Sequence, residues 1–188
     1  ELAQFIDADL AKKLSPIENC RAWHGRLQAE IARIFGLSEN VKVSIGSGDN
    51  MMSAIGAGAI GAGQVVASLG TSGTLFGVSK KPVTLPDSDL APFRDATGNH
   101  LPLYCLQNCS SAIEEVHQST QRSLEELTTE ATDLAPTSGP LFLPYLTGER
   151  SPDWPHASGV LFEIRPGKLQ PAALFRAAME GVSYGLYR

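Results

Sequence analysis

A segment rich in glycine and alanine, residues 44–63, leads from the β-rich segment VKVSIG at 41–46 to a second one, QVVASLG at 64–70. Glycine adopts backbone conformations that other residues avoid, and it lets a second backbone or a ligand approach closely. Such a segment between two strands has few uses: a phosphate-binding loop, a dinucleotide fingerprint, a strand end that carries a catalytic acid, or a helix packed through small residues. Its only charged residue is Asp49.

The sequence context excludes dinucleotide binding, although Gly56, Gly58 and Gly61 spell G-x-G-x-x-G. That fingerprint needs a strand directly before it, a helix opening within it and an acidic residue about 20 positions on. Here the next β-rich segment begins three residues after Gly61, and positions 76–81 hold no acid. No G-K-[ST] follows these glycines, which excludes a Walker loop. The sequence therefore predicts a tightly packed helix over about 50–63.

Asp49 follows a strand end and a glycine turn, and the predicted helix begins just beyond it. Two interpretations remain open at this point. A carboxylate in this place caps the first N–H groups of a helix. It also suits a general base, because sites in α/β proteins lie where strands end and helices begin.

A tight turn joins the next two β-rich segments, QVVASLG and TLFGVS, into a predicted hairpin. The turn consists of Gly70, Thr71, Ser72 and Gly73. Its backbone N–H groups and two hydroxyls are groups that bind phosphate. Ordinary turn chemistry accounts for the same residues, so both interpretations stay open.

Hydrophobic periodicity and Gly/Pro punctuation predict an α/β fold for the whole chain. The expected helices cover 1–14, 22–35 with Gly36 as C-cap, 111–127, and 171 to the end of the chain. The expected strands lie at 41–46, 64–70, 74–79 and 141–146. Between them we expect a loop with a strand fragment at 80–100, a polar linker at 128–140 and a long loop at 147–159.

Composition narrows the class of protein. A net charge of −5 argues against nucleic-acid binding. The sequence contains no run of 18 apolar residues, and its first residues do not show the pattern of a secretory leader, so we expect neither a membrane span nor secretion. Three cysteines predict a reducing cytoplasm rather than a disulfide framework. The spacing of the cysteines and histidines forms no metal-ligand pattern. Because the chain lacks an initiator Met and stops within a helix, we expect a fragment of a longer protein.

Four motifs in order, GSGDN, SLGTSGT, LPYLTGER and SGVLFEI…LFRAAMEGVSYGL, resemble the FGGY carbohydrate kinases, most closely the xylulokinases among them. The resemblance covers about residues 41–188. It implies an actin-like, ribonuclease H-like ATPase fold, here a partial second lobe of a two-lobed sugar kinase. Residues 1–40 would be the tail of the first lobe with its crossover helices. Residues 41–188 would be the first part of the ATP-side lobe, truncated at its C-terminus.

The sequence departs from the family pattern in two places and lacks two of its elements. The second signature expects glycine where Glu163 stands and a polar residue where Ala173 stands, while Ala177 to Glu180 fit. These departures affect which sugar is expected as the substrate more than they affect the expected phosphoryl transfer. The D-x-G-T phosphate hairpin of the first lobe and the later glycine-rich adenosine segment are not found in this sequence.

The resemblance implies roles for particular residues. Asp49 would be the general base for the sugar hydroxyl, and Asn50 would bind the sugar or orient the base. The turn Gly70, Thr71, Ser72 and Gly73 would bind ATP phosphates. Glu149 and Arg150 would form an ion pair that fixes a loop, or would act near ATP or the sugar.

The implied reaction is phosphorylation of D-xylulose to D-xylulose 5-phosphate by ATP. Mg²⁺ would bridge the phosphates, with its ligands mostly in the first lobe and none assigned to this chain. D-ribulose, gluconate and glycerol remain alternative substrates, and a non-catalytic actin-like nucleotide-binding or regulatory protein is an alternative of another class. The expected partners are a small sugar and ATP, with no nucleic acid or membrane, and a homodimer remains open. We expect the isolated fragment to be inactive.

Overall fold

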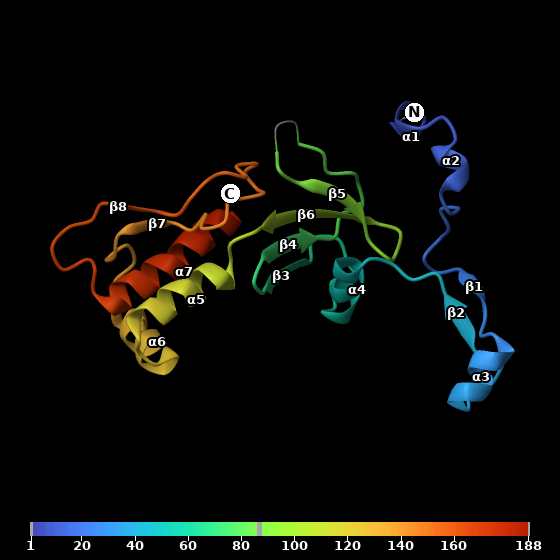
Figure 1. Cartoon of the computed structure of the whole chain (residues 1–188), viewed down its shortest axis with the longest axis horizontal. Helices are drawn as coiled ribbons and strands as arrows, with labels where there is room; N and C mark the ends of the chain where they lie inside the picture. The colour runs from blue at the N-terminus through green and yellow to red at the C-terminus, as the bar shows by residue number, and fades with distance from the viewer. Residues whose placement is uncertain (1, 86–87, 188) are drawn as a thin grey trace.

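The computed structural model describes residues 2–85 and 88–187 of the 188-residue chain. An N-terminal arm, residues 2–48, stands largely apart from the rest, a four-stranded sheet with one helix forms the middle, and helices with a two-stranded ladder form the other end (Figure 1). The predicted α/β class is confirmed. Predictions that fall on residues 1, 86–87 and 188 lie outside the described residues.

The elements of the arm and the sheet are α1 (Leu2–Ile6), α2 (Leu10–Lys13), β1 (Trp23–Arg26), α3 (Ala29–Phe35), β2 (Lys42–Ser44), α4 (Asp49–Gly56), β3 (Val65–Leu69), β4 (Gly73–Gly77), β5 (Ala91–Arg94) and β6 (His100–Leu106). The C-terminal part contains α5 (Ser110–Thr120), α6 (Leu124–Asp133), β7 (Leu141–Leu143), β8 (Val160–Phe162) and α7 (Pro171–Tyr187). Over the described residues, no helix combines the length and apolarity that crossing a bilayer requires.

The arm differs from the helices predicted for it. The N-terminal helix breaks between α1 and α2, where the Asp7 carboxylate accepts the N–H of Asp9 at 2.8 Å. The first part of the predicted helix 22–35 forms β1 instead, which pairs antiparallel with β2. Lys42 lies 4.9 Å from the centre of the Trp23 ring across this pair. Tertiary pairing thus overrides the helical spacing, whereas α3 ends at Gly36, in the left-handed region with φ 64°, as predicted.

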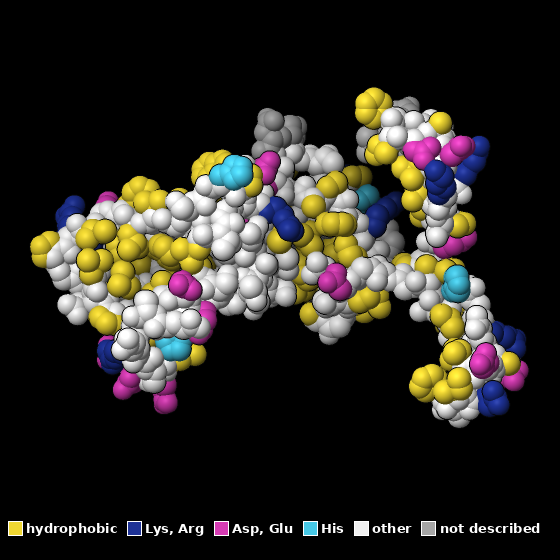
Figure 2. All heavy atoms as spheres, in the orientation of Figure 1, with side chains coloured by type: hydrophobic (Ala, Val, Ile, Leu, Met, Phe, Trp, Pro, Cys, Tyr) yellow, Lys and Arg dark blue, Asp and Glu magenta, His cyan; other side chains and the backbone are white. Residues whose placement is uncertain are grey.

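The arm contacts the sheet at the turn between β5 and β6. The Arg21 guanidinium donates to the Thr97 carbonyl at 2.7 Å, and the Cys20 thiol donates to the Ala96 carbonyl at 2.8 Å. Figure 2 shows hydrophobic side chains on the outside of the arm, where Phe5, Ile17 and others are exposed. Because its apolar side chains are exposed, the arm contributes little to the core.

The glycine-rich segment is a short helix followed by a loop, so the helix predicted over 50–63 is too long. Helix α4 ends at Gly56, and the N–H of Ala59 reaches back to the Ala54 carbonyl at 2.8 Å. Gly58 and Gly63 have φ angles of 82° and 87°, in the left-handed region that ends helices. The small residues therefore serve a sharp reversal from α4 into β3 as well as packing.

The middle sheet is antiparallel throughout, in the order β3-β4-β6-β5. The predicted hairpin β3–β4 is confirmed, with Leu69 opposite Gly73. Strand β5 is the fragment expected within 80–100, but β6 was not predicted. Pro102 disfavours a strand interior, and it is tolerated here because it lies beyond the β4 ladder, which ends at Leu103, and opposite Pro92 of the edge strand. The buried residues of this sheet form a core with α4.

The helix predicted over 111–127 and the linker predicted over 128–140 are also wrong. Gln121, with φ 54°, ends α5, and a capping box of Ser123 and Glu126 starts α6. Helix α6 packs its Leu127 and Ala131 against Phe175 of α7. Helix α7 also packs against α5 and β7, so it joins the helices to the C-terminal ladder.

We predict opposite effects of adding a methyl group to two helical glycines. A Cβ at Gly181 of α7 would lie 2.3 Å from the Phe142 carbonyl oxygen, whereas one at Gly56 of α4 meets nothing within 4 Å. Gly181→Ala should lower the free energy of unfolding by about 1–3 kcal/mol through overpacking. Gly56→Ala should raise it by about 0.5–1 kcal/mol through helix propensity. Urea unfolding measures both, and stabilisation by Gly181→Ala would contradict the close packing of α7 on β7.

Candidate functional site

The hairpin turn at 70–73 presents its hydroxyls outward and its carbonyls inward. The Gly70 carbonyl accepts the N–H of Ser110 at 3.0 Å. The Thr71 carbonyl accepts the N–H of Cys109 at 3.1 Å and the Ser111 hydroxyl at 3.1 Å. Among the described residues, the exposed hydroxyls of Thr71 and Ser72 make no hydrogen bond. The turn is therefore fixed on the start of α5 while both hydroxyls stay available to a ligand.

Gly73 is required at the end of this turn by close packing. A Cβ at Gly73 would lie 3.0 Å from the Cys109 sulfur and 3.2 Å from its Cβ. Cys109 is 2% exposed and packs with Ala112 and Val182 below the turn. Any larger residue at position 73 would push the hairpin away from α5.

Asp49 is the first residue of α4, and its side chain is exposed. The N-cap position belongs to Gly48, so the first of the two interpretations of Asp49 is wrong. One carboxylate oxygen accepts the N–H of Asn50 at 2.8 Å, which orients the group at the helix N-terminus. The partial positive charge of that helix end stabilises a carboxylate in this position. Its remaining lone pairs face solvent.

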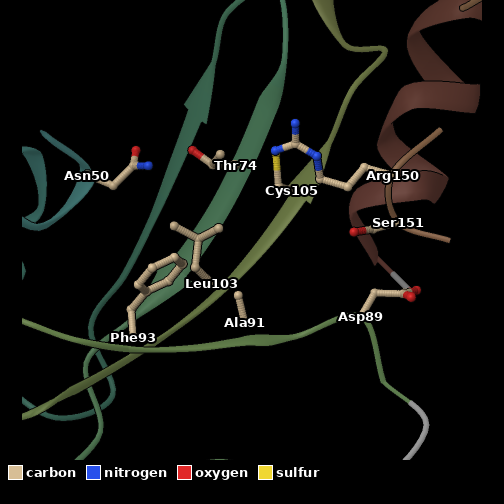
Figure 3. Close-up of a pocket in the computed structure, with 9 residues that line it drawn as sticks. All are labelled: Asn50, Thr74, Asp89, Ala91, Phe93, Leu103, Cys105, Arg150 and Ser151. Carbon is tan, nitrogen blue, oxygen red and sulfur yellow. The ribbon is translucent and has the colours of Figure 1, made fainter. Parts of the chain in front are cut away.

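Asn50, the next residue, lines a cavity of about 320 Å³ between α4, the sheet and the loop after β7 (Figure 3). The apolar side of the cavity is formed by the sheet, with Leu103 of β6 and Phe93 of β5. Its polar groups converge from different elements, among them Asn50 and Thr74 at one end and Arg150 at the other. A concave apolar site with a few convergent polar groups is typical of small-molecule binding. Thr74 directly follows Gly73, so the cavity and the hairpin turn are neighbours along β4.

The loop 147–150 turns Glu149 inward and Arg150 outward. Gly148 makes this possible with φ 76°, and a Cβ there would lie 2.3 Å from the Pro155 carbonyl oxygen. Glu149 is 2% exposed, and its carboxylate accepts the backbone N–H groups of Gln107 at 2.5 Å and Arg150 at 2.8 Å. The ion pair expected between Glu149 and Arg150 does not form. The guanidinium of Arg150 instead lies 3.8 Å from the Cys105 sulfur at the cavity.

Sequence reasoning missed three residues of this region: Thr74, Cys105 and Asn108. Cys105 was considered only for disulfide and metal chemistry, but it is half-buried and lines the cavity. Asn108 is 2% exposed and donates to the Gly148 carbonyl at 2.6 Å. Its position at a strand end, just before a helix, was the available signal.

Residues 65–188 match the model of the FGGY family of carbohydrate kinases, C-terminal domain. The chain is 37% identical over 164 residues to the xylulose kinase of Haemophilus influenzae, covering 86% of this chain and 33% of that protein. It is 39% identical over 149 residues to the xylulose kinase of Streptomyces coelicolor, covering 79% and 29%. A gluconokinase of Bacillus licheniformis is 31% identical over 173 residues, covering 84% and 33%. The chain spans about a third of the length of the curated relatives that it matches.

Solved structures show the same relationship. A crystal structure of a "xyloylose kinase" from Brucella ovis matches with a TM-score of 0.81 at 30% identity, covering 91% of this chain and 36% of that chain. The ligand-bound xylulose kinase of Lactobacillus acidophilus matches with a TM-score of 0.84 at 23% identity, covering 96% and 39%. The actin-like sugar-kinase fold predicted from the motifs is confirmed, as is its partial coverage by this chain.

We predict that the thiols of Cys105 and Cys109 are alkylated at different rates. Cys105 lines the open cavity, whereas burial raises the pKa of the Cys109 thiol. Each unit by which a thiol pKa rises removes about tenfold of the reactive thiolate below that pKa. Because Cys109 is also 2% exposed, iodoacetamide at pH 8 should modify Cys105 clearly faster than Cys109, as measured by peptide mass spectrometry. Equal rates would show that Cys109 is not shielded by the turn and α5.

Proposed function

Because this chain belongs to the FGGY family of carbohydrate kinases, we propose that it forms one side of the site of an ATP-dependent sugar kinase, with D-xylulose as the leading substrate. One observation carries the proposal. The exposed carboxylate of Asp49 stands at a helix N-terminus, next in sequence to Asn50, which lines a cavity of about 320 Å³. The sheet that lines this cavity carries the hairpin turn, whose two hydroxyls have no hydrogen-bond partner in the described part of the chain. Base, acceptor cavity and phosphate-binding turn are the parts that phosphoryl transfer to a hydroxyl requires.

The base in this proposal is Asp49. Its carboxylate accepts the proton of the sugar hydroxyl that attacks the γ-phosphorus of ATP, while the bond from that phosphorus to the leaving ADP oxygen breaks. Such a base contributes roughly 10²–10⁴-fold. The bond from the Asn50 N–H keeps the carboxylate oriented, and the Asn50 side chain faces the cavity (Figure 3). The side-chain amide would hydrogen-bond sugar hydroxyls there.

The turn at 70–73 would bind phosphate oxygens in this proposal. The carbonyls of Gly70 and Thr71 are bonded to residues 109–111, and the Ser72 carbonyl accepts the N–H of Gly70. The hydroxyls of Thr71 and Ser72 and their backbone N–H groups would then be the donors offered to phosphate. Anion binding by consecutive backbone N–H groups needs no side-chain charge. Positioning of the phosphates, rather than covalent chemistry, is what the protein supplies in phosphoryl transfer.

Mg²⁺ fits this proposal as a companion of ATP. Within residues 2–85 and 88–187, no three His, Cys, Asp or Glu side chains gather so as to hold a metal ion. Mg²⁺ keeps several waters and binds through one or two carboxylates plus substrate phosphates. It would neutralise phosphate charge, with its protein ligands mostly outside this chain. The free thiols of Cys20, Cys105 and Cys109 suit the reducing cytoplasm that we propose as its compartment.

The choice of sugar rests on the relatives. Xylulose kinases share 37–39% identity with the chain, and a gluconokinase shares 31%. D-Xylulose therefore leads, with D-ribulose, gluconate and glycerol as alternatives. A non-catalytic nucleotide-binding protein remains the second class of function, and Asp49 discriminates between the two. Because the chain spans about a third of its relatives, the test uses the protein from the complete reading frame.

We predict that Asp49→Ala causes a large loss of turnover and leaves the fold intact. ADP release is measured with D-xylulose, D-ribulose, gluconate and glycerol in turn. The substitution should lower kcat by about 10²-fold or more and leave the sugar KM nearly unchanged, because it removes proton transfer. Asp133→Ala, at an exposed acid at the end of α6, is the matched control. Most of the activity surviving in Asp49→Ala would remove this residue from the mechanism.

Sugar binding should also protect Cys105 from alkylation, which gives a readout independent of turnover. Cys105 and Asn50 line the same cavity, so an occupying sugar shields the thiol. D-Xylulose without ATP should slow iodoacetamide labelling of Cys105 several-fold and leave Cys20 labelling unchanged, since Cys20 lies at the arm. If all four sugars left the Cys105 rate unchanged at saturating concentrations, the cavity would not be the acceptor site.

A further inference from the structure

Glu149 is a buried carboxylate that no cation neutralises among the described residues. Besides the N–H groups of Gln107 and Arg150, its second oxygen accepts the backbone N–H of Asn108 at 3.3 Å and the Asn108 side-chain amide at 3.1 Å. Burying a charge costs several kcal/mol unless hydrogen bonds compensate for it. A carboxylate buried in this place indicates that its two oxygens fix the backbone segments that donate hydrogen bonds to them.

The segment that Glu149 holds is the same one that holds the hairpin turn. Gln107 and Asn108 donate to Glu149, and the next residues, Cys109 and Ser110, donate to the carbonyls of Thr71 and Gly70. Four consecutive N–H groups thus divide between the carboxylate and the turn. The connection from β6 to α5, residues 107–110, is therefore hydrogen-bonded to Glu149 by its first half and to the hairpin turn by its second half.

The loop 147–150 is fixed in turn by the side chains of this connection. The Asn108 amide donates to the Gly148 carbonyl at 2.6 Å, and the Gln107 amide donates to the Thr147 carbonyl at 3.2 Å. The N–H of Glu149 and the carbonyl of Trp154 form a bond of 2.9 Å, which closes the loop on itself. Glu149 therefore has little freedom to follow a displaced connection.

We propose that Glu149 is a positioning residue for the phosphate-binding turn, acting through the backbone of residues 107–110. This inference rests on the proposed function, because it takes the turn at 70–73 to bind ATP phosphates. Glu149 does not touch the ligand, since its oxygens are occupied and buried, and a negative charge at the phosphates would repel them. Its role is to hold the carbonyls of Gly70 and Thr71 against α5, which keeps the exposed Thr71 and Ser72 on the outer side of the turn.

A carboxylate performs this role better than its isosteric amide. Both oxygens of Glu149 accept N–H groups, two donors each. Glutamine would place an NH₂ donor against at least two of those donors. The connection would then shift, and a displacement of about 1 Å in a site that works by positioning costs about 10²-fold.

The first test compares Glu149→Gln and Glu149→Asp in the protein from the complete reading frame. Glu149→Gln should lower kcat/KM for ATP by about tenfold to a hundredfold and leave the Kd of the sugar unchanged within a factor of two. Glu149→Asp keeps both oxygens on a shorter side chain and should restore part of the loss. If Glu149→Gln does not fold, Glu149→Asp carries the test alone, with a smaller loss confined to ATP. A loss shared equally by ATP and sugar would overturn the proposal.

A stability-matched variant separates positioning from general weakening of the fold. Leu127 is fully buried between α6 and α7, away from the turn, so Leu127→Ala should cost about 2–5 kcal/mol. At a temperature where both variants stay folded, Leu127→Ala should keep the wild-type kcat/KM for ATP. If it reproduced the ATP defect of Glu149→Gln, the defect would reflect stability, and the proposal would fall.

A double-substitution cycle with Thr71→Ala tests the route through the turn. If Glu149 acts by placing Thr71 and its neighbours, the double variant should lose clearly less than the product of the single losses. Multiplicative losses would show independent action and overturn the positioning role. No ATP defect in Thr71→Ala together with none in Glu149→Gln would contradict the phosphate role of the turn. A defect in Thr71→Ala alone would keep the proposed function and reject this inference.

Discussion

The site depends on how the four backbone N–H groups of residues 107–110 are satisfied. They lie where the central strand β6 passes into α5, and buried backbone donors without partners are expensive. Two of them donate to the Glu149 carboxylate and two to the carbonyls of the hairpin turn. This single segment thereby connects the sheet, the helices and the loop 147–150. The positions of the turn and of the loop 147–150 depend on each other because both are hydrogen-bonded to this segment.

Glycine makes these close approaches possible. Gly73 leaves room for Cys109 below the turn, Gly148 lets the loop 147–150 touch the backbone of Pro155, and Gly181 lets α7 touch β7. At each of these positions a Cβ would meet another atom at 3.0 Å or less. Glycine costs chain entropy on folding, so its use here indicates that backbone proximity, rather than side-chain packing, sets the geometry around the site.

The sequence predicted the elements that local signals specify. The hairpin β3–β4 follows from two β-rich segments around a Gly-Thr-Ser-Gly turn, and the end of α3 follows from Gly36. Strand β1 was missed because the apolar residues around it have helical spacing, while its strand form depends on pairing with β2. Strand β6 was missed because Pro102 argues against a strand, and only pairing with other strands makes the segment one. The extent of α4 was overestimated because glycine and alanine fit both a helix and the loop that follows it.

In the candidate site, too, local motifs could be predicted from the sequence, whereas contacts between distant residues could not. Asp49 and the turn 70–73 stand in recognisable motifs, so their places at the start of a helix and in a hairpin turn could be anticipated. The partners of Glu149 could not, because Gln107 and Asn108 lie about 40 residues earlier and carry no motif. Charge complementarity suggested Arg150 as the nearest partner, but a buried carboxylate can be satisfied equally by backbone N–H groups. Arg150 is thereby left to face the cavity.

The exposure of Asp49 has a consequence for the proposed reaction. A carboxylate in water is strongly solvated, and a proton acceptor works better once water is displaced from its surroundings. Within this chain the Asn50 N–H and the helix end orient Asp49 but do not cover it. In the proposed reaction, the bound sugar would supply that cover. If Asp49 is the base, as proposed, a site that is completed only when the sugar binds would delay desolvation of the carboxylate until then, which would limit transfer of phosphate to water.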